Sequence, residues 1–97
     1  MTKGYWISVY EKVADPEIQK KYAEKATVAI KKFRGIFLCR GGKNLCLEGG
    51  SKSPRTVIVE FSSYEDAEKC YNSKEYKEAL YVLKDSAKRS LQIVEGV

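Results

Sequence analysis

Two stretches with helical periodicity, each enclosed by runs of β-branched and aromatic residues, are the feature that most limits how this chain can fold. The strand-like runs cover residues 4–10, 36–40, 55–61 and 91–94. The resulting order, strand–helix–strand–strand–helix–strand, predicts an α+β protomer of the ferredoxin-like type, with an antiparallel sheet and the helices on one face. Since 97 residues is well below the ~150 usual for a domain, residues 1–97 are expected to form a single domain.

Residues typical of helix ends mark both helical stretches. Asp15-Pro16 supplies an N-cap and a proline at the first helical position, and Gly35 stands where a C-terminal cap belongs. Ser62-Ser63-Tyr64-Glu65 matches a capping box that opens the second helix, and Ser73 begins a further turn of it. The glycine- and serine-rich segment 49–54 is expected to be a flexible loop.

Apolar side chains occupy both alternating positions of the strands, although the helices can cover only one face of the sheet. This holds for residues 4–10 and for residues 55–61. We expect Trp6, Tyr10 and Ile58 to lie on the uncovered face, where they would form an exposed apolar patch of the kind that marks an interface. Packing of two sheets against each other would bury this patch, so the sequence predicts a homodimer with these three residues in its interface.

The inventory of side chains excludes several kinds of site. The sequence has no histidine, which removes histidine-based catalytic triads, histidine-ligated haem and histidine-containing zinc sites. The cysteines, Cys39, Cys46 and Cys70, lack the C-x-x-C spacing of zinc or thioredoxin-like sites and are expected to be inert buried thiols. We therefore expect no metal and no cofactor.

The cysteine count, the hydropathy and the charge indicate the cell compartment and the kinds of partner to expect. An odd number of cysteines leaves one thiol over in any disulfide scheme, which favours the reducing cytoplasm. No apolar signal region opens the sequence and no stretch is long enough to span a bilayer, so no membrane partner is expected. The net charge of +5 permits an anionic partner. Nucleic acid is not expected, because Arg55 is followed by Thr56-Val57-Ile58-Val59, which lacks the stacking aromatics of RNA-recognition modules.

Several short motifs recur, in the same order, in one known family. They are Gly4-Tyr5-Trp6, Arg40-Gly41-Gly42, Glu48-Gly49, Arg55 with the strand ending at Phe61, the segment from Ser63-Tyr64 to Tyr71, Ser73 with Tyr76, and Val94-Glu95-Gly96. In these motifs the chain resembles the domain-of-unknown-function family DUF1330, within the dimeric α/β barrel superfamily, over essentially its whole length. The resemblance implies a ferredoxin-like protomer whose sheet packs on that of a second copy to form a barrel with the helices outside. It implies no settled activity.

One departure from the family pattern bears on binding. The family usually has an arginine late in the second helix, where this chain has Leu83-Lys84. If that arginine helps to bind an anion in the family, the role is either lost here or taken by Lys84.

Arg40, Arg55 and Glu60 are charged residues inside or beside strands that are otherwise apolar. They favour one of two arrangements. In the first, a guanidinium at the sheet edge binds a ligand carboxylate in bidentate fashion. In the second, Arg40 or Arg55 forms an ion pair with Glu60 that holds strands or protomers in register.

Tyrosines and glycines supply weaker candidates. Four tyrosines belong to the second helical region, and they either orient a ligand in a pocket or lie at the edge of the core: Tyr64, Tyr71, Tyr76 and Tyr81. Gly41-Gly42-Lys43-Asn44 either offers backbone N–H groups to an anion or forms a β-bulge or turn, and a bulge would re-aim Arg40.

These observations predict a cytoplasmic homodimer that binds a small and anionic molecule, with Arg40, Arg55, Glu60, Tyr64 and Tyr71 as candidate ligand-binding residues. The first alternative is a cofactor-independent enzyme, monooxygenase- or isomerase-like, that acts on a small aromatic or carbonyl substrate, because relatives in the superfamily include such enzymes. The second alternative is a structural interaction module. Without histidine or a recognisable pair of catalytic carboxylates, no residue is assigned a catalytic role.

Overall fold

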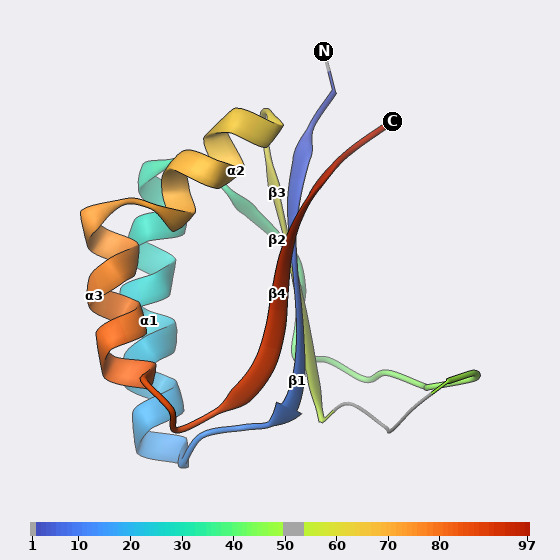
Figure 1. The fold of residues 1–97 in the computed structure, drawn as a ribbon, viewed down its shortest axis with the longest axis vertical. Helices are drawn as coiled ribbons and strands as arrows, with labels where there is room; N and C mark the ends of the chain where they lie inside the picture. The colour runs from blue at the N-terminus through green and yellow to red at the C-terminus, as the bar shows by residue number, and fades with distance from the viewer. Residues whose placement is uncertain (1, 50–53) are drawn as a thin grey trace.

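A four-stranded antiparallel sheet carries all the described helices on one of its faces (Figure 1). The structure is a computed structural model that describes residues 2–49 and 54–97. Its elements are β1 (Gly4–Lys12), α1 (Pro16–Lys32), β2 (Ile36–Arg40), β3 (Arg55–Phe61), α2 (Tyr64–Tyr71), α3 (Lys74–Leu83) and β4 (Lys88–Glu95).

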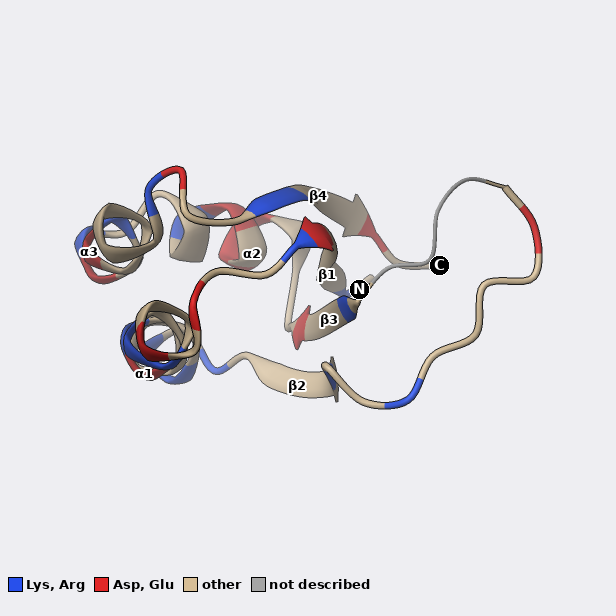
Figure 2. Ribbon diagram, turned by 90° about the horizontal axis from the view of Figure 1, so that it is seen from below, with Lys and Arg blue, Asp and Glu red and all other residues tan. Residues whose placement is uncertain are grey.

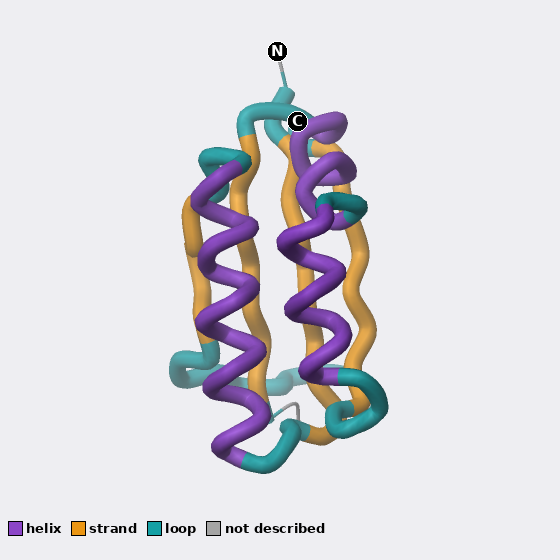
Figure 3. The backbone as a smooth tube through the Cα atoms, turned by 90° about the vertical axis from the view of Figure 1, so that its left-hand side faces the viewer, coloured by secondary structure: helices purple, strands orange, loops and turns teal. Residues whose placement is uncertain are grey.

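The strand order β2-β3-β1-β4 places β1 between β3 and β4, and it pairs antiparallel with both. This confirms the predicted α+β, ferredoxin-like arrangement. The sheet is open within the chain, so the protomer itself is not a closed barrel. The helices α1 and α3 run side by side along the strands (Figure 3). Helix α2 lies at the end of α3, so that α2 and α3 form a second column beside α1 (Figure 3). The predicted loop at 49–54 falls mostly outside the described residues.

The helix ends agree with the predicted caps to within one residue. Pro16 opens α1, and the helix closes with two backbone bonds, from Arg34 N–H to Lys31 O (3.0 Å) and from Gly35 N–H to Ile30 O (2.8 Å). Arg34, and not Gly35, takes the left-handed conformation there, with φ 61°. Gly35 is required for space, because a Cβ at this position would lie 2.6 Å from the Ile30 side chain.

Serine side chains cap the two helices of the second column. Ser63 Oγ accepts from Asp66 N–H (3.0 Å), so the N-cap lies one residue later than the predicted capping box of residues 62–65. Ser73 Oγ accepts from Tyr76 N–H (3.2 Å) and starts a separate helix rather than a further turn.

The prediction that Trp6 and Tyr10 lie on the uncovered face is wrong. Both side chains point toward the helices, where they are 3% and 1% exposed. Trp6 donates its indole N–H to Ala67 O (2.9 Å) and packs against the ring of Tyr76 (4.8 Å between centroids). These contacts to α2 and α3 decide which face of β1 is buried. Ile58 does lie on the opposite, uncovered face, directly across from Ile7.

The uncovered face is largely apolar. It carries the partly exposed side chains of Tyr5, Ile7, Val9, Ile58 and Val94. The segment 41–49 leaves the sheet on this same side, away from the helices (Figures 1 and 2), and it holds the exposed Leu45 and Leu47.

The cysteines differ in their surroundings. Cys70 is buried, and burial raises the pKa of its thiol to about 12. Cys39 and Cys46 are exposed, so the expectation of buried thiols is wrong for these two.

No helix in the described part of the chain is long and apolar enough to cross a membrane.

Lys84 holds a backbone conformation that suits glycine. It has φ 43° and ψ −126° in the turn after α3, where Leu83 O accepts from Ser86 N–H (2.9 Å). This is the geometry of a type II′ turn, whose first central residue is normally glycine.

We predict that Lys84→Gly raises the free energy of unfolding by about 1 kcal/mol, since it relieves backbone strain worth about 1–3 kcal/mol and loses only an exposed contact between Lys84 and the Tyr81 ring. Urea denaturation measures the change. Lys77→Gly, inside the same helix, is the matched control and should lower stability by about 1 kcal/mol. A Lys84→Gly variant less stable than the parent would show that the turn is not strained.

Candidate ligand-binding site

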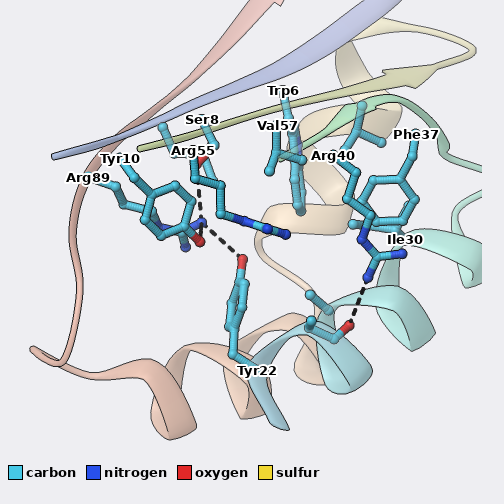
Figure 4. Close-up of a pocket in the computed structure, with 14 residues that line it drawn as sticks. Trp6, Ser8, Tyr10, Tyr22, Ile30, Phe37, Arg40, Arg55, Val57 and Arg89 are labelled. Carbon is cyan, nitrogen blue, oxygen red and sulfur yellow. Dashed lines mark hydrogen bonds between the residues drawn. The ribbon is translucent and has the colours of Figure 1, made fainter. Parts of the chain in front are cut away.

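A cavity lies between the sheet and α1 (Figure 4). The volume open to the centres of water molecules is about 30 Å³. Its walls come from β1, β2, β3, β4 and α1, and the lining residues are Trp6, Ser8, Tyr10, Tyr22, Ala23, Ala26, Ile30, Phe37, Arg40, Arg55, Val57, Val59, Arg89 and Leu91.

The sheet presents its cavity-facing side chains in successive cross-strand rows. The first row is basic and aromatic, with Tyr10 of β1 directly opposite both Arg55 of β3 and Arg89 of β4. The next row is mixed: Arg40, Val57, Ser8 and Leu91. The row after that is apolar: Phe37, Val59 and Trp6, with Ile93 in the same row beyond the cavity wall. The cavity floor therefore changes from charged to apolar along the strands.

Arg89 is held by hydroxyl groups from three other elements. Its Nη1 donates to Tyr22 OH (3.0 Å) and, at longer range, to Ser8 Oγ (3.3 Å) and Tyr10 OH (3.4 Å). Its Nη2 donates to Tyr76 OH (2.9 Å), and Tyr76 OH is itself hydrogen-bonded to Tyr22 OH. No carboxylate of the described residues forms an ion pair with Arg89. The guanidinium is thus solvated by neutral groups but not neutralised.

Burial keeps the tyrosines of this network protonated. Burial raises the pKa of Tyr22 and of Tyr76 above the usual range, and the positive charge of Arg89 offsets part of the rise. For Arg89, burial lowers the pKa, but Tyr22, Tyr76 and Tyr10 together raise it by more, so it remains a permanent cation.

A β-bulge turns Arg40 into the cavity. In a regular strand Arg40 would share a face with Ile36 and Leu38, which is the uncovered face. One extra residue is inserted between Phe37 and Cys39, so that Arg40 stands opposite Val57 on the cavity face. Its guanidinium lies over the Phe37 ring (4.0 Å) and donates to Thr27 Oγ1 of α1 (2.7 Å). The bulge therefore lies before Arg40, between Phe37 and Cys39, whereas the sequence suggested a bulge at Gly41-Gly42.

Gly41 makes room for Arg55. A Cβ at Gly41 would lie 2.3 Å from Arg55 Nη1, and Gly41 also has φ 70°, which disfavours other residues. Its N–H donates to Thr56 O (2.9 Å), so it continues the pairing of β2 with β3. Figure 4 shows the Arg55 side chain reaching into the middle of the cavity from the side of Tyr10.

The charge in the cavity is one-sided. Three of the four arginines of the sequence line it, and among the described residues no lysine and no aspartate or glutamate does. The fourth arginine, Arg34, is exposed at the end of α1. The described residues also contain no cluster of three or more histidine, cysteine or acidic side chains able to hold a metal ion.

The structure brings together only part of the set proposed from the sequence. Arg40 and Arg55 line the cavity, but Glu60 lies on the opposite face of the sheet and pairs with Lys3 (3.1 Å). The predicted ion pair of Glu60 with Arg40 or Arg55 is therefore wrong. Tyr71 packs edge-on against Trp6 (6.1 Å), and neither it nor Tyr64 lines the cavity. Lys84 lies over the Tyr81 ring (4.2 Å), also away from the cavity.

Sequence reasoning missed Arg89 and Tyr22, and it named Tyr76 only among the tyrosines of the second helical region. The position of Arg89 could have been predicted from the sequence. It alternates in phase with Leu91 and Ile93 on β4 and therefore lies on the same face of the sheet. Tyr22 and Tyr76 lie on the apolar stripes of their helices. That their hydroxyls meet depends on how α1 packs beside α3, which periodicity does not reveal.

The sequence profile of DUF1330, a domain of unknown function, matches residues 3–97. The chain belongs to the DUF1330 family. No curated protein matches it.

Solved structures share the fold of this DUF1330 chain. A protein of unknown function from Rhodopseudomonas palustris, RPA0582, superposes with a TM-score of 0.75 at 16% identity, over 99% of this chain and 83% of that one. A dimeric protein of unknown function with a ferredoxin-like fold from Bacteroides fragilis gives 0.62 at 14% identity, over 96% and 95%. SnoaB, a cofactor-independent oxygenase from Streptomyces nogalater, gives 0.60 at 9% identity, over 95% and 90%. At these identities the likeness concerns the fold alone.

The raised tyrosine pKa values predict a loss of stability at alkaline pH. Below pH ~10, tyrosine is neutral in both the folded and the unfolded chain, and the free energy of unfolding is unaffected by its titration. Above this pH the unfolded chain releases protons that folded Tyr22 and Tyr76 retain, so the free energy of unfolding falls. We expect Tyr76→Phe to make the fall in urea midpoint above pH ~10 less steep. Buried Cys70 contributes equally in both proteins.

Tyr81→Phe, which removes a hydroxyl from an exposed ring, is the matched control. An equal slope in the parent and in Tyr76→Phe would contradict the role given to the buried hydroxyls.

Proposed function

We propose that this chain binds a small anionic molecule in the cavity between the sheet and α1. The observation that carries the proposal is the collection of Arg40, Arg55 and Arg89 around one cavity that no acidic side chain of the described residues lines. Because arginine keeps its charge at every physiological pH, the cavity is positive whenever it is empty.

Electrostatics favour an anion there for two reasons. Like charges repel each other, and the repulsion between the partly buried Arg55 and Arg89 is stronger than in water, because the local dielectric constant is lower, whereas Arg40 is exposed. A bound anion replaces this repulsion by attraction and accepts charge-assisted hydrogen bonds from the guanidinium groups. The hydroxyl groups around Arg89 hold its charge in place before a ligand arrives.

The chain is further proposed to act in the cytoplasm as a homodimer formed through the uncovered face of the sheet. The partly exposed apolar side chains there, including Ile7 and Ile58, support the dimer, as does the dimeric state of the similar Bacteroides fragilis protein. Pairing of two such sheets would produce the barrel that the family resemblance implies. The exposed thiols of Cys39 and Cys46 favour a reducing compartment.

A second candidate function is cofactor-independent catalysis on a small aromatic or carbonyl substrate. It is favoured by the fold shared with SnoaB and by a narrow cavity that offers Arg89 and protonated tyrosines to a developing negative charge. Turnover in a panel of quinols and lactones distinguishes catalysis from binding alone.

For the anion site, we predict that Arg55→Met abolishes stabilisation by anions. A panel of sulfate, acetate and butyrate, followed by urea denaturation, should contain an anion that raises the stability of the parent by about 2.7 kcal/mol at a hundredfold excess over its Kd. Arg55→Met should lose this effect while remaining nearly as stable as the parent without ligand, because the relief of like-charge repulsion offsets the loss of the contacts that Arg55 makes.

The matched control is Arg34→Met, which removes the one arginine outside the cavity and should leave anion stabilisation intact. A loss of several kcal/mol from unliganded Arg55→Met would instead assign Arg55 a structural role and contradict the proposal.

For the dimer, we predict that Ile58→Glu converts it to a monomer of 11.0 kDa, because a charge would be forced into a desolvated surface. Sedimentation at micromolar concentration measures the mass. Val28→Glu, at an exposed valine on α1, is the control and should stay dimeric. A parent protein that sediments as a monomer would refute the proposed interface.

A further inference from the structure

We infer that the anion bound in this cavity is a short monocarboxylate with an apolar body, oriented with its carboxylate toward Arg55 and Arg89 and its hydrocarbon toward Trp6 and Val57. The inference rests on the proposed anion-binding function and specifies the chemical class of the ligand.

The choice of basic residue points to a planar oxyanion. The sequence has far more lysine than arginine, yet the basic side chains of the cavity are all arginine among the described residues. Lysine offers a point charge, whereas the guanidinium fork matches the two oxygens of a carboxylate or of a phosphate. The arginines therefore indicate an anionic group with paired oxygens, but they do not distinguish a carboxylate from a phosphate.

The apolar wall decides between them. Trp6, Ile30, Val57, Val59 and Leu91 line the same cavity as the arginines. Sulfate or phosphate has oxygen on every side and cannot replace the water that contacts these side chains. A carboxylate attached to a hydrocarbon can bind the arginines and also pack against the apolar side chains. Each methylene group that is buried tightens binding about fourfold.

The order of the cross-strand rows sets the orientation of the ligand. Arg55 and Arg89 stand in one row on either side of Tyr10, whereas Val57, with Arg40 beside it, and then Trp6 follow in the next rows along the sheet. Figure 4 shows the same progression, with Arg89 and Tyr10 at one end of the cavity and Trp6 and Val57 beside its middle. The narrow space, of which about 30 Å³ is open to the centres of water molecules, limits the hydrocarbon to a few carbons.

The test compares butyrate, its neutral isostere butyramide, and sulfate by calorimetric titration of the full chain. We expect butyrate to bind about tenfold more tightly than sulfate or butyramide. Val57→Thr, which places a hydroxyl in the apolar wall at nearly constant volume, should weaken butyrate several-fold and leave sulfate unchanged. Arg55→Lys should weaken butyrate, whereas Arg34→Lys, outside the cavity, should not.

The outcomes separate this inference from the proposed function. Sulfate binding as tightly as butyrate, with both lost in Arg55→Met, would overturn the carboxylate assignment and keep the anion site. Butyramide binding as tightly as butyrate would overturn both, because charge would then contribute nothing. Absence of binding by all three compounds would likewise overturn both.

Discussion

Arg89 carries a permanent positive charge into the space between the sheet and the helices, and the side chains around it are arranged to solvate that charge. Because a guanidinium does not release its proton in a protein, the fold has to supply acceptors. The acceptors here are hydroxyls of β1, α1 and α3, so that a single side chain of β4 ties three other elements together. Hydroxyls solvate a cation without neutralising it, which leaves the interior of this DUF1330 chain positive.

Two local departures from regular strand structure bring further charge to the same place. The one-residue bulge in β2 turns Arg40 from the uncovered face to the cavity face, and Gly41 leaves the space that Arg55 occupies. In a regular β2 strand, Arg40 would lie on the uncovered face, and the cavity would keep only the charges of Arg55 and Arg89. Part of the positive charge of the cavity therefore depends on a bulge that a well-packed core does not require, which is why we relate it to a ligand.

The topology could be predicted because the strand and helix periodicities are clear and serines cap both later helices. The faces of β1 could not, because aromatic and β-branched residues stand on both of them and Ser8 lies in phase with Trp6 and Tyr10. The site was half predictable. Arg40 and Arg55 stood out as charges in apolar strands, and Arg89 was open to the same argument. The bulge that aims Arg40 and the helix packing that joins Tyr22 to Tyr76 depend on tertiary contacts that no short sequence pattern reports.

A crystal structure of the protein grown with butyrate tests the binding site directly. We expect butyrate in the cavity between the sheet and α1, with its carboxylate oxygens within hydrogen-bond distance of Arg55 or Arg89 and its carbons against Val57 and Trp6. Butyrate found only on surface lysines, with the cavity occupied by water, would contradict the claim that the collected arginines form a binding site.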